Sequence, residues 1–192
     1  MSISMTKGQK ISLSKSGGGQ LTRVKMGLGW DAAEVKGMFG RSKTKAIDLD
    51  ASCLMLDAGR EVVDTIWFRQ LKSKDGSIMH TGDNTTGAGE GDDESIIVEL
   101  GNVPASIETL VFTVNSYSKQ GFSEVLNAFC RLVDETSNSE VARFDLSAQG
   151  PHTAMVMAKV YRHGGEWKMA ALGDSGDGKT VKEMIPLVLG AI

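Results

Sequence analysis

Several features that mark common protein classes are missing from this sequence. No apolar run approaches the roughly 20 residues that a membrane-spanning helix needs, and residues 1–10 lack the apolar core of a secretory signal. The only cysteines, Cys53 and Cys130, lie in apolar stretches without the spacing of a metal site. We therefore expect a cytoplasmic protein with no integral membrane segment and two buried, reduced thiols, and a Cys53–Cys130 disulfide is the less favoured alternative.

A basic surface and catalytic motifs are missing as well. The chain has 21 Lys and Arg residues against 24 Asp and Glu, a net charge of −3, which argues against general binding to nucleic acid. His80, His152 and His163 are scattered, and neither Gly-x-Ser-x-Gly nor His-Glu-x-x-His occurs. The sequence therefore favours a protein that is not an enzyme.

One stretch concentrates acidic residues. Residues 80–94 (HTGDNTTGAGEGDDE) contain five carboxylates and four glycines, and no Lys or Arg. Crowded carboxylates repel one another, and we expect no nearby basic residue to relieve them. A calcium ion would relieve this repulsion, because it takes about six to eight oxygen ligands. The glycines would let the backbone turn its carbonyl oxygens toward such an ion. The alternative is an acidic loop that is only solvated.

Two motifs come close to known templates. Asp83 and Glu94 have the spacing of the first and last ligands of an EF-hand loop, but Ala88 replaces its glycine and a strand follows. Residues 173–180 (GDSGDGKT) match the phosphate-binding loop Gly-x-x-x-x-Gly-Lys-Thr, between a predicted strand and a predicted helix. Asp174 and Asp177 disfavour phosphate in that loop. A P-loop-like nucleotide-binding protein using Gly173–Thr180 is therefore the alternative function.

The periodicity predicts a mainly β protein. Alternating and β-branched runs predict strands at residues 11–14, 21–28, 46–57, 62–71, 95–100, 109–116, 129–133, 140–146, 154–161 and 166–172. Only residues 180–192 have helical spacing, and residues 34–45 have no clear period, so we interpret the latter as a mobile excursion. Because strands and helices do not alternate, we predict one domain over residues 1–192, a two-sheet β-sandwich with a short C-terminal helix.

The run AIDLDASCLMLD, residues 46–57, is the most informative strand. Its odd-numbered residues from Ile47 to Met55 are apolar and share one face. The other face begins with Asp48 and Asp50 and continues with apolar leucines. This pattern predicts a strand between two layers that exposes carboxylates at one rim. The alternative is that both aspartates only cap turns or accept backbone hydrogen bonds.

Several motifs resemble those of one known family. They are Gly27-Leu-Gly-Trp-Asp31, Asp48-Leu-Asp-Ala-Ser52, His80-Thr-Gly-Asp-Asn84, Gly87-x-Gly-x-Gly-Asp-Asp-Glu94 and Tyr161-Arg-His-Gly-Gly-Glu-Trp167. Together they resemble the TerD family of tellurium-resistance proteins, from about Ile11 to Leu172. Residues 65–69 (TIWFR) and 127–131 (NAFCR) are similar to its TerZ branch.

The resemblance implies a cytoplasmic, calcium-binding β-sandwich linked to tellurite resistance and stress response, with no established enzyme activity. It also implies partners in multiprotein, partly membrane-associated assemblies. Residues 34–45 are an insertion relative to shorter members of the family, and we predict that they form a surface for a partner. By motif matching, the metal-ligand donors are Asp83, Asn84, Asp92, Asp93 and Glu94, with carbonyls near Gly87, Gly89 and Gly91. Asp31, Asp48 and Asp50 are predicted to complete the site.

Overall fold

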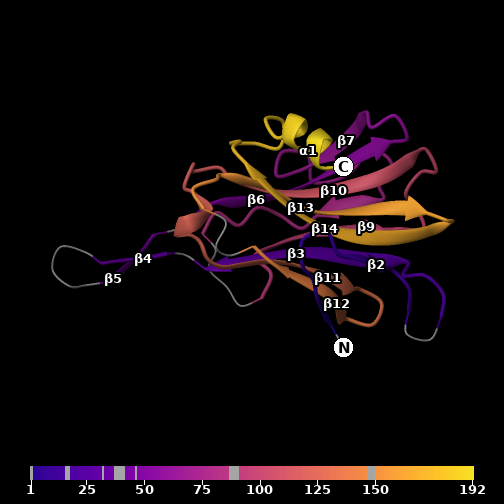
Figure 1. Ribbon diagram of the computed structural model, residues 1–192, viewed down its shortest axis with the longest axis horizontal. Coiled ribbons are helices and arrows are strands. Elements are labelled where there is room, and N and C mark those ends of the chain that lie inside the picture. Colours follow the sequence, from indigo (N-terminus) through magenta and orange to yellow (C-terminus); the bar gives the residue numbers. More distant parts are fainter. Residues whose placement is uncertain are drawn as a thin grey trace.

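The computed structural model describes residues 2–15, 18–31, 33–36, 42–45, 47–86, 91–146 and 150–192, with only the backbone of residues 33–36 and 42–45. These residues form two six-stranded sheets packed face to face (Figure 1). The predicted β-sandwich is therefore confirmed. Among the described residues, no helix has the length and apolar character that crossing a membrane requires.

Sheet A contains, in spatial order, β1 (Ile3–Ser4), β12 (Ser139–Asp145), β11 (Leu126–Asp134), β3 (Arg23–Asp31), β9 (Glu94–Glu99) and β8 (Ile78–His80). Sheet B contains β2 (Lys10–Ser12), β14 (Glu166–Gly176), β13 (Ala154–His163), β10 (Ile107–Ser116), β6 (Leu49–Asp57) and β7 (Val62–Ile66). The pairings described within these sheets are antiparallel, apart from β1 with β12.

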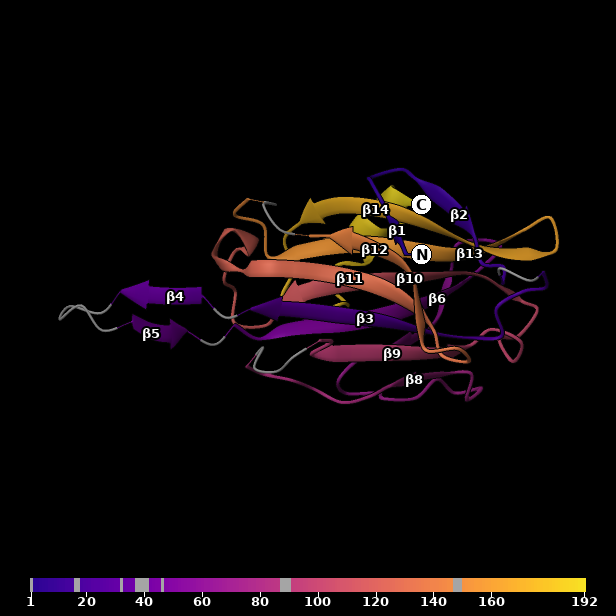
Figure 2. The ribbon, with the colours of Figure 1, turned by 90° about the horizontal axis from the view of Figure 1, so that it is seen from below.

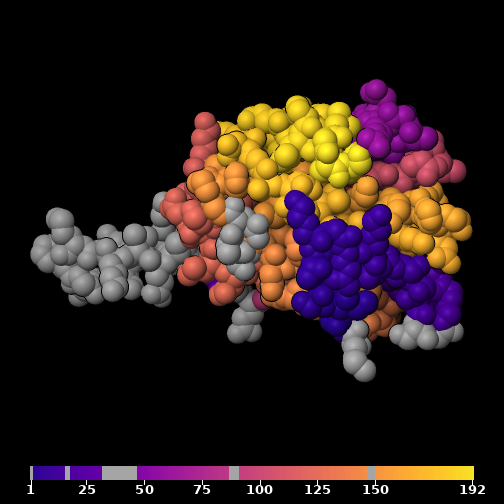
Figure 3. Space-filling model, in the orientation of Figure 1, coloured from indigo at the N-terminus to yellow at the C-terminus, as the bar shows by residue number. Residues whose placement is uncertain are grey.

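The N-terminal segment joins both sheets. β1 pairs with β12 of sheet A, and β2 pairs with β14 of sheet B. Figure 3 shows this segment in indigo, lying on the surface across one side of the sandwich. It therefore links the edges of the two layers by backbone hydrogen bonds.

β6 has the two apolar faces that its sequence predicts. Leu49, Cys53 and Met55 belong to the core between the sheets. Leu54 and Leu56 point to the other side, where they join a second apolar cluster with residues of α1 (Ile185–Ala191). β6 therefore lies between two apolar layers, with α1 packed on the outer face of sheet B (Figure 1).

Both cysteines are buried and free. Burial raises the pKa of the Cys53 thiol well above its ordinary value and that of Cys130 to about 12. This confirms the prediction of two buried, reduced thiols.

Some predicted elements are wrong in extent. The interpretation of residues 34–45 as irregular is wrong for β4 (Ala33–Lys36) and β5 (Ser42–Lys45), which form an antiparallel hairpin that projects from the sandwich (Figures 1 and 2). Their cross-strand hydrogen bonds satisfy backbone groups that side-chain periodicity does not report. The remainder of that segment, residues 37–41, lies outside the described residues.

The last helix and the strand after β6 are shorter than predicted. α1 begins only at Ile185, and Pro186 lies in its first turn, where a missing N–H costs nothing. β7 ends at Ile66 because Trp67 and Gln70 exchange two backbone hydrogen bonds in a tight turn. β8 was not predicted, since three residues carry too little periodicity. A 3₁₀ turn, η1 (Phe122–Glu124), precedes β11.

Candidate metal centre

Acidic residues from both sheets meet at one end of the sandwich. β3 ends at Asp31, β6 begins directly after Asp48, and β8 leads into residues 81–86. β9 starts at Glu94 and lies between β3 and β8 in sheet A. We call this end the acidic rim; it is also the end from which the β4–β5 hairpin projects (Figure 2).

Three aspartates of the rim lie close enough to share one ion. Within the described part of the chain, Asp48, Asp50 and Asp83 are the group whose ligand oxygens all lie within 4.8 Å of one another. We call this group the aspartate triad. Asp50 is buried, Asp48 is half-buried and Asp83 is exposed, so the triad opens to solvent. Oδ1 of Asp48 is buried and has no hydrogen-bond partner among the described residues. An all-oxygen donor set with an unpartnered buried oxygen fits a hard divalent cation.

The pKa values of the triad reflect its crowding. Burial, followed by the charges of acidic neighbours, raises the pKa of Asp50 to about 8. Those neighbours are Glu94, Asp48 and Asp83. Burial also raises the pKa of Asp48, and the charges of Asp83 and Glu94 add to it. A cation among these groups would favour their ionised forms, because opposite charge lowers the pKa of a carboxyl.

Asn115 orients the buried member of the triad. It lies directly opposite Asp50 in the pairing of β10 with β6. Its Nδ2 donates to Asp50 Oδ2 at 2.9 Å and to the carbonyl of Lys179 at 2.8 Å. Sequence reasoning missed this residue. The available signal was a polar side chain near the end of an otherwise apolar strand, residues 109–116.

Glu94 connects the two sheets beside the triad. Its Oε2 accepts a hydrogen bond from the backbone N–H of Ala51 at 2.7 Å, and its Oε1 accepts one from Asn84 at 3.0 Å. His80 Nε2 lies 3.4 Å from the same Oε2, while His80 Nδ1 accepts a hydrogen bond from the Gly82 N–H. Both side chains of the His80–Glu94 pair are fully buried. Glu94 is therefore an anchor between the sheets, and its role as a metal ligand stays a prediction.

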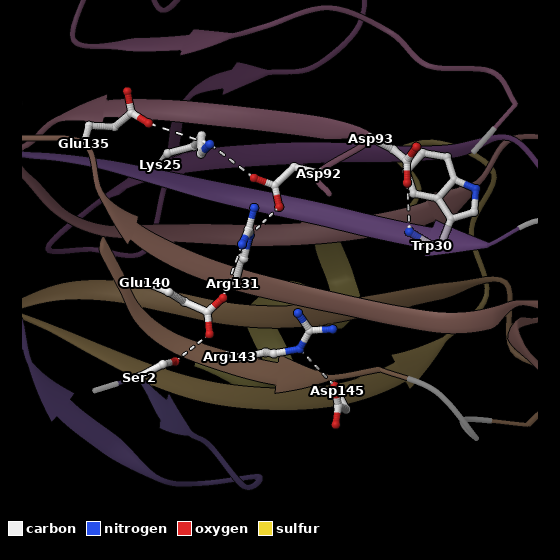
Figure 4. Close-up of polar contacts among 10 residues, drawn as sticks. All are labelled: Ser2, Lys25, Trp30, Asp92, Asp93, Arg131, Glu135, Glu140, Arg143 and Asp145. Atoms are coloured by element: carbon white, nitrogen blue, oxygen red, sulfur yellow. Dashed lines mark hydrogen bonds and ion pairs between the residues drawn. The ribbon is translucent and has the colours of Figure 1, made fainter. Parts of the chain in front are cut away.

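Asp93 and Asp31 form a second acidic group at the rim. Asp93 accepts hydrogen bonds from the Trp30 N–H at 2.9 Å (Figure 4) and from Asn84 Nδ2 at 3.0 Å. Burial raises the pKa of Asp93, and the charge of Asp31 contributes. Asp31 is exposed and accepts a hydrogen bond from Asn127 at 2.6 Å. These two aspartates lie outside the triad, so the predicted ligands divide into two groups.

Asp92 faces away from the metal centre. Its Oδ1 lies 2.6 Å from Arg131 Nε and its Oδ2 lies 3.2 Å from Lys25 Nζ, with 5% of its side chain exposed. Figure 4 shows that Lys25 also approaches Glu135, in the turn after β11, and that Arg131 also approaches Glu140 of β12. The expectation that no basic residue relieves the acidic stretch is therefore wrong for Asp92. Because two cations already share its carboxylate, we leave Asp92 out of the metal site proposed below.

The alternating glycines of β3 make room for the end of the acidic stretch. A Cβ on Gly27 would overlap the Asp92 carboxylate, and a Cβ on Gly29 would overlap the Phe129 ring and the Gly91 carbonyl oxygen. Gly91 has a φ of 96°, which favours glycine. The other two predicted carbonyl donors, Gly87 and Gly89, lie outside the described residues.

Gly27→Ala is expected to lower the free energy of unfolding by about 1–3 kcal/mol, because its methyl group displaces Asp92 from its two cations. Urea denaturation measures the loss. Gly101→Ala is the matched control, since a Cβ there meets open space, and we expect a change within about 0.5 kcal/mol. Equal stability of the two variants would contradict this packing role.

The phosphate-loop alternative is wrong. Residues 173–176 are the end of β14 and pair with β13 in an antiparallel sheet, so the motif lacks the strand–loop–helix form. The N–H of Gly178 donates to Thr153 Oγ1 at 3.1 Å. The ammonium of Lys179 lies 4.3 Å from the centre of the Tyr117 ring. Groups that would hold a phosphate are thus already engaged within the protein.

Comparison with known proteins identifies the family. The TerD domain matches residues 1–185. The chain belongs to the TerD family. This confirms the resemblance inferred from the glycine-rich and acidic motifs.

Named TerD relatives match over nearly their whole length. The chain is 44% identical to tellurium resistance protein TerZ of Serratia marcescens, over 99% of this chain and 98% of the relative. It is 42% identical to general stress protein 16U of Bacillus subtilis (strain 168), over 93% of each. The crystal structure of a homologue of telluride resistance protein (TerD) from Streptomyces coelicolor A3(2) superposes with a TM-score of 0.71 at 22% identity, over 86% of this chain and 95% of that one. That structure supports the TerD fold.

Proposed function

We propose that this TerD-family protein binds calcium at Asp48, Asp50 and Asp83 and acts as a metal-dependent interaction module, not an enzyme, in tellurite resistance or stress response. The observation that carries the proposal is the aspartate triad, in which Asp48 Oδ1 is buried and has no hydrogen-bond partner within the described part of the chain. The names of the relatives, tellurium resistance protein and general stress protein, support the biological setting.

Calcium suits the triad better than magnesium. The three carboxylates come from two separate segments and differ in burial, from the buried Asp50 to the exposed Asp83. Calcium accepts such irregular oxygen ligation, whereas magnesium demands near-octahedral geometry and dehydrates reluctantly. The solvent-open side leaves room for water or further carbonyl ligands. Binding would join the loop at residues 81–86 to the start of β6.

Calcium titration of the melting temperature tests the metal site. A ligand present at about 100 times its Kd stabilises the folded state by about 2.7 kcal/mol, which corresponds to a rise of roughly 5–10 °C for a chain of this size. We expect this rise for the native protein, and its loss when Asp48→Asn and Asp83→Asn are combined. Asp145→Asn is the control, since Asp145 is exposed and distant from the triad on β12. A native protein whose melting temperature ignores calcium would refute the site.

The interaction role has a separate readout. We propose that the partners are other proteins of the same response and that the protein acts in the cytoplasm without nucleic acid. Affinity purification of the tagged chain in calcium and in chelator, with the Asp48→Asn, Asp83→Asn variant in parallel, should recover the same protein partners only in the calcium-bound native sample. If the protein binds calcium but recovers no such partner, the metal site is supported and the role as an interaction module is refuted.

A further inference from the structure

The two outer faces of the sandwich differ in how their cations are paired. On sheet A, Lys25 and Arg131 both approach Asp92, and Arg143 Nε lies 3.5 Å from Asp145 (Figure 4). On sheet B, a group of three lysines has no ion pair within the described part of the chain. They are Lys10, Lys159 and Lys168.

Strand register places these three lysines on one face. Lys168 of β14 pairs with Tyr161 of β13, and Ala170 of β14 lies between Lys159 of β13 and Lys10 of β2. The intervening residues of β13 and β14 point into the core between the sheets. The lysines therefore lie on the outer face of sheet B. The small side chain of Ala170 separates Lys10 from Lys159 by two strand spacings, about 10 Å.

A hollow of about 310 Å³ opens on this face. It is lined by Lys10, Ile11, Ser12, Tyr161, His163 and Lys168. Lys159 adjoins it, with Nζ 5.4 Å from the centre of the Tyr161 ring, and the rings of Tyr161 and His163 are 6.5 Å apart. The nearest carboxylate on β14, that of Glu166, accepts a hydrogen bond from Ser12 Oγ at 3.0 Å. We call this the basic hollow.

The charges around the hollow repel one another. Burial lowers the pKa of Lys159, and the cations of Lys10 and Arg60 lower it further. Among the described residues, the half-buried ammonium group of Lys159 has no carboxylate partner, so its charge is uncompensated much as the charges of the crowded aspartates at the acidic rim are. The hollow lies toward the turn between β13 and β14, at the other end of the sandwich from the rim (Figures 1 and 2). An anion bound there would relieve the repulsion that Lys10 and Arg60 exert on Lys159.

We propose that the basic hollow binds a phosphate monoester through Lys10, Lys159 and Lys168. A phosphate monoester carries about −1.5 to −2 charges at neutral pH and three acceptor oxygens, so it can engage several ammonium groups at once. A carboxylate, with one charge, neutralises only one lysine. Two sources present this chemistry, a soluble phosphate ester and the headgroup of a phosphatidic acid lipid. The site is independent of the metal centre.

Titration with inorganic phosphate, followed by ¹⁵N NMR, tests the site. We expect saturable shifts of the Tyr161 and Lys168 amides that chloride at equal ionic strength does not reproduce. Combining Lys159→Gln with Lys168→Gln should weaken phosphate binding at least about tenfold, because it removes two of the three ammonium groups that would donate charge-assisted hydrogen bonds. Lys10→Gln, at an exposed position, provides a second variant if the first is unstable. Lys72→Gln is the control, because Lys72 pairs with Met79 of β8 in sheet A, and this variant should bind as the native protein does.

Vesicles then separate the two sources. Sedimentation with phosphatidylcholine vesicles that contain phosphatidic acid, but not with phosphatidylcholine alone, would assign a lipid headgroup, provided that inorganic phosphate competes. Phosphate binding without sedimentation would assign a soluble ester, and both results support the site. The proposal is overturned if phosphate produces no more shift than chloride, or if neither lysine variant weakens binding.

Discussion

Glu94→Ala is expected to lower the free energy of unfolding by about 2–4 kcal/mol. The substitution removes the acceptor of the buried Ala51 N–H, at about 1–3 kcal/mol, and of the part-buried Asn84 N–H at a smaller cost, and it opens a cavity between the sheets. Loss of the negative charge beside Asp50 offsets part of this cost, because Glu94 contributes to the raised pKa of Asp50. Urea denaturation in chelator measures the change without interference from bound metal.

Glu99→Ala is the matched control on the same strand. Glu99 lies 2.7 Å from Arg23 in an ion pair with 35% of its side chain exposed, and such pairs contribute about 0–1 kcal/mol. A Glu94→Ala variant that loses no more stability than Glu99→Ala would show that the carboxylate does not hold the sheets together. His80→Gln probes the same link, because it removes the imidazole that lies 3.4 Å from Glu94.

The sequence predicted best where the deciding interactions repeat locally. The strict alternation from Ile47 to Met55 identified both faces of β6, since successive side chains of a strand point to opposite sides. The same alternation put Asp48 and Asp50 on one face at the strand start, where the structure joins them with Asp83. The strand period was sufficient to place Asp48 and Asp50 together because the two residues are only two positions apart in the sequence.

Prediction failed where the partner comes from a distant segment. Lys25 and Arg131 neutralise Asp92, but they lie on β3 and β11, and only the sheet register brings them together. Nothing within residues 80–94 reports them. The hydrogen bond from the Ala51 N–H to Glu94 has the same origin, since it crosses from sheet B to sheet A. The acidic stretch thus has two roles. Asp83 contributes a carboxylate to the triad, while Asp92 forms the ion pairs that hold the stretch on sheet A.

Without calcium, stability should fall as the pH rises from about 4 to about 8. The pKa of Asp50 is 3.8 in the reference state and is raised to about 8 in the folded protein, first by burial. The folded state therefore binds more protons than the unfolded state between these values. The contribution of Asp50 to the free energy of unfolding is fully present below the lower pKa and is lost as the pH rises to the upper one. Asp48 and Asp93 act in the same direction. The lowered pKa values of Asp64 and Asp134 act below this window.

Calcium should abolish this decline, because the ion favours the ionised carboxylates that the apo fold penalises. Urea denaturation across the window, in chelator and in saturating calcium, measures both profiles. Asp50→Asn supplies the control: it keeps an oxygen for the hydrogen bond from Asn115 but carries no charge, so its chelator profile should lose most of the slope. A flat native profile in chelator, or an unchanged slope in Asp50→Asn, would contradict the assignment. The uncompensated carboxylates cause the slope in chelator, and bound calcium would remove it. Comparing the two profiles therefore distinguishes a metal centre, which loses the slope in calcium, from a solvated acidic rim, which keeps it.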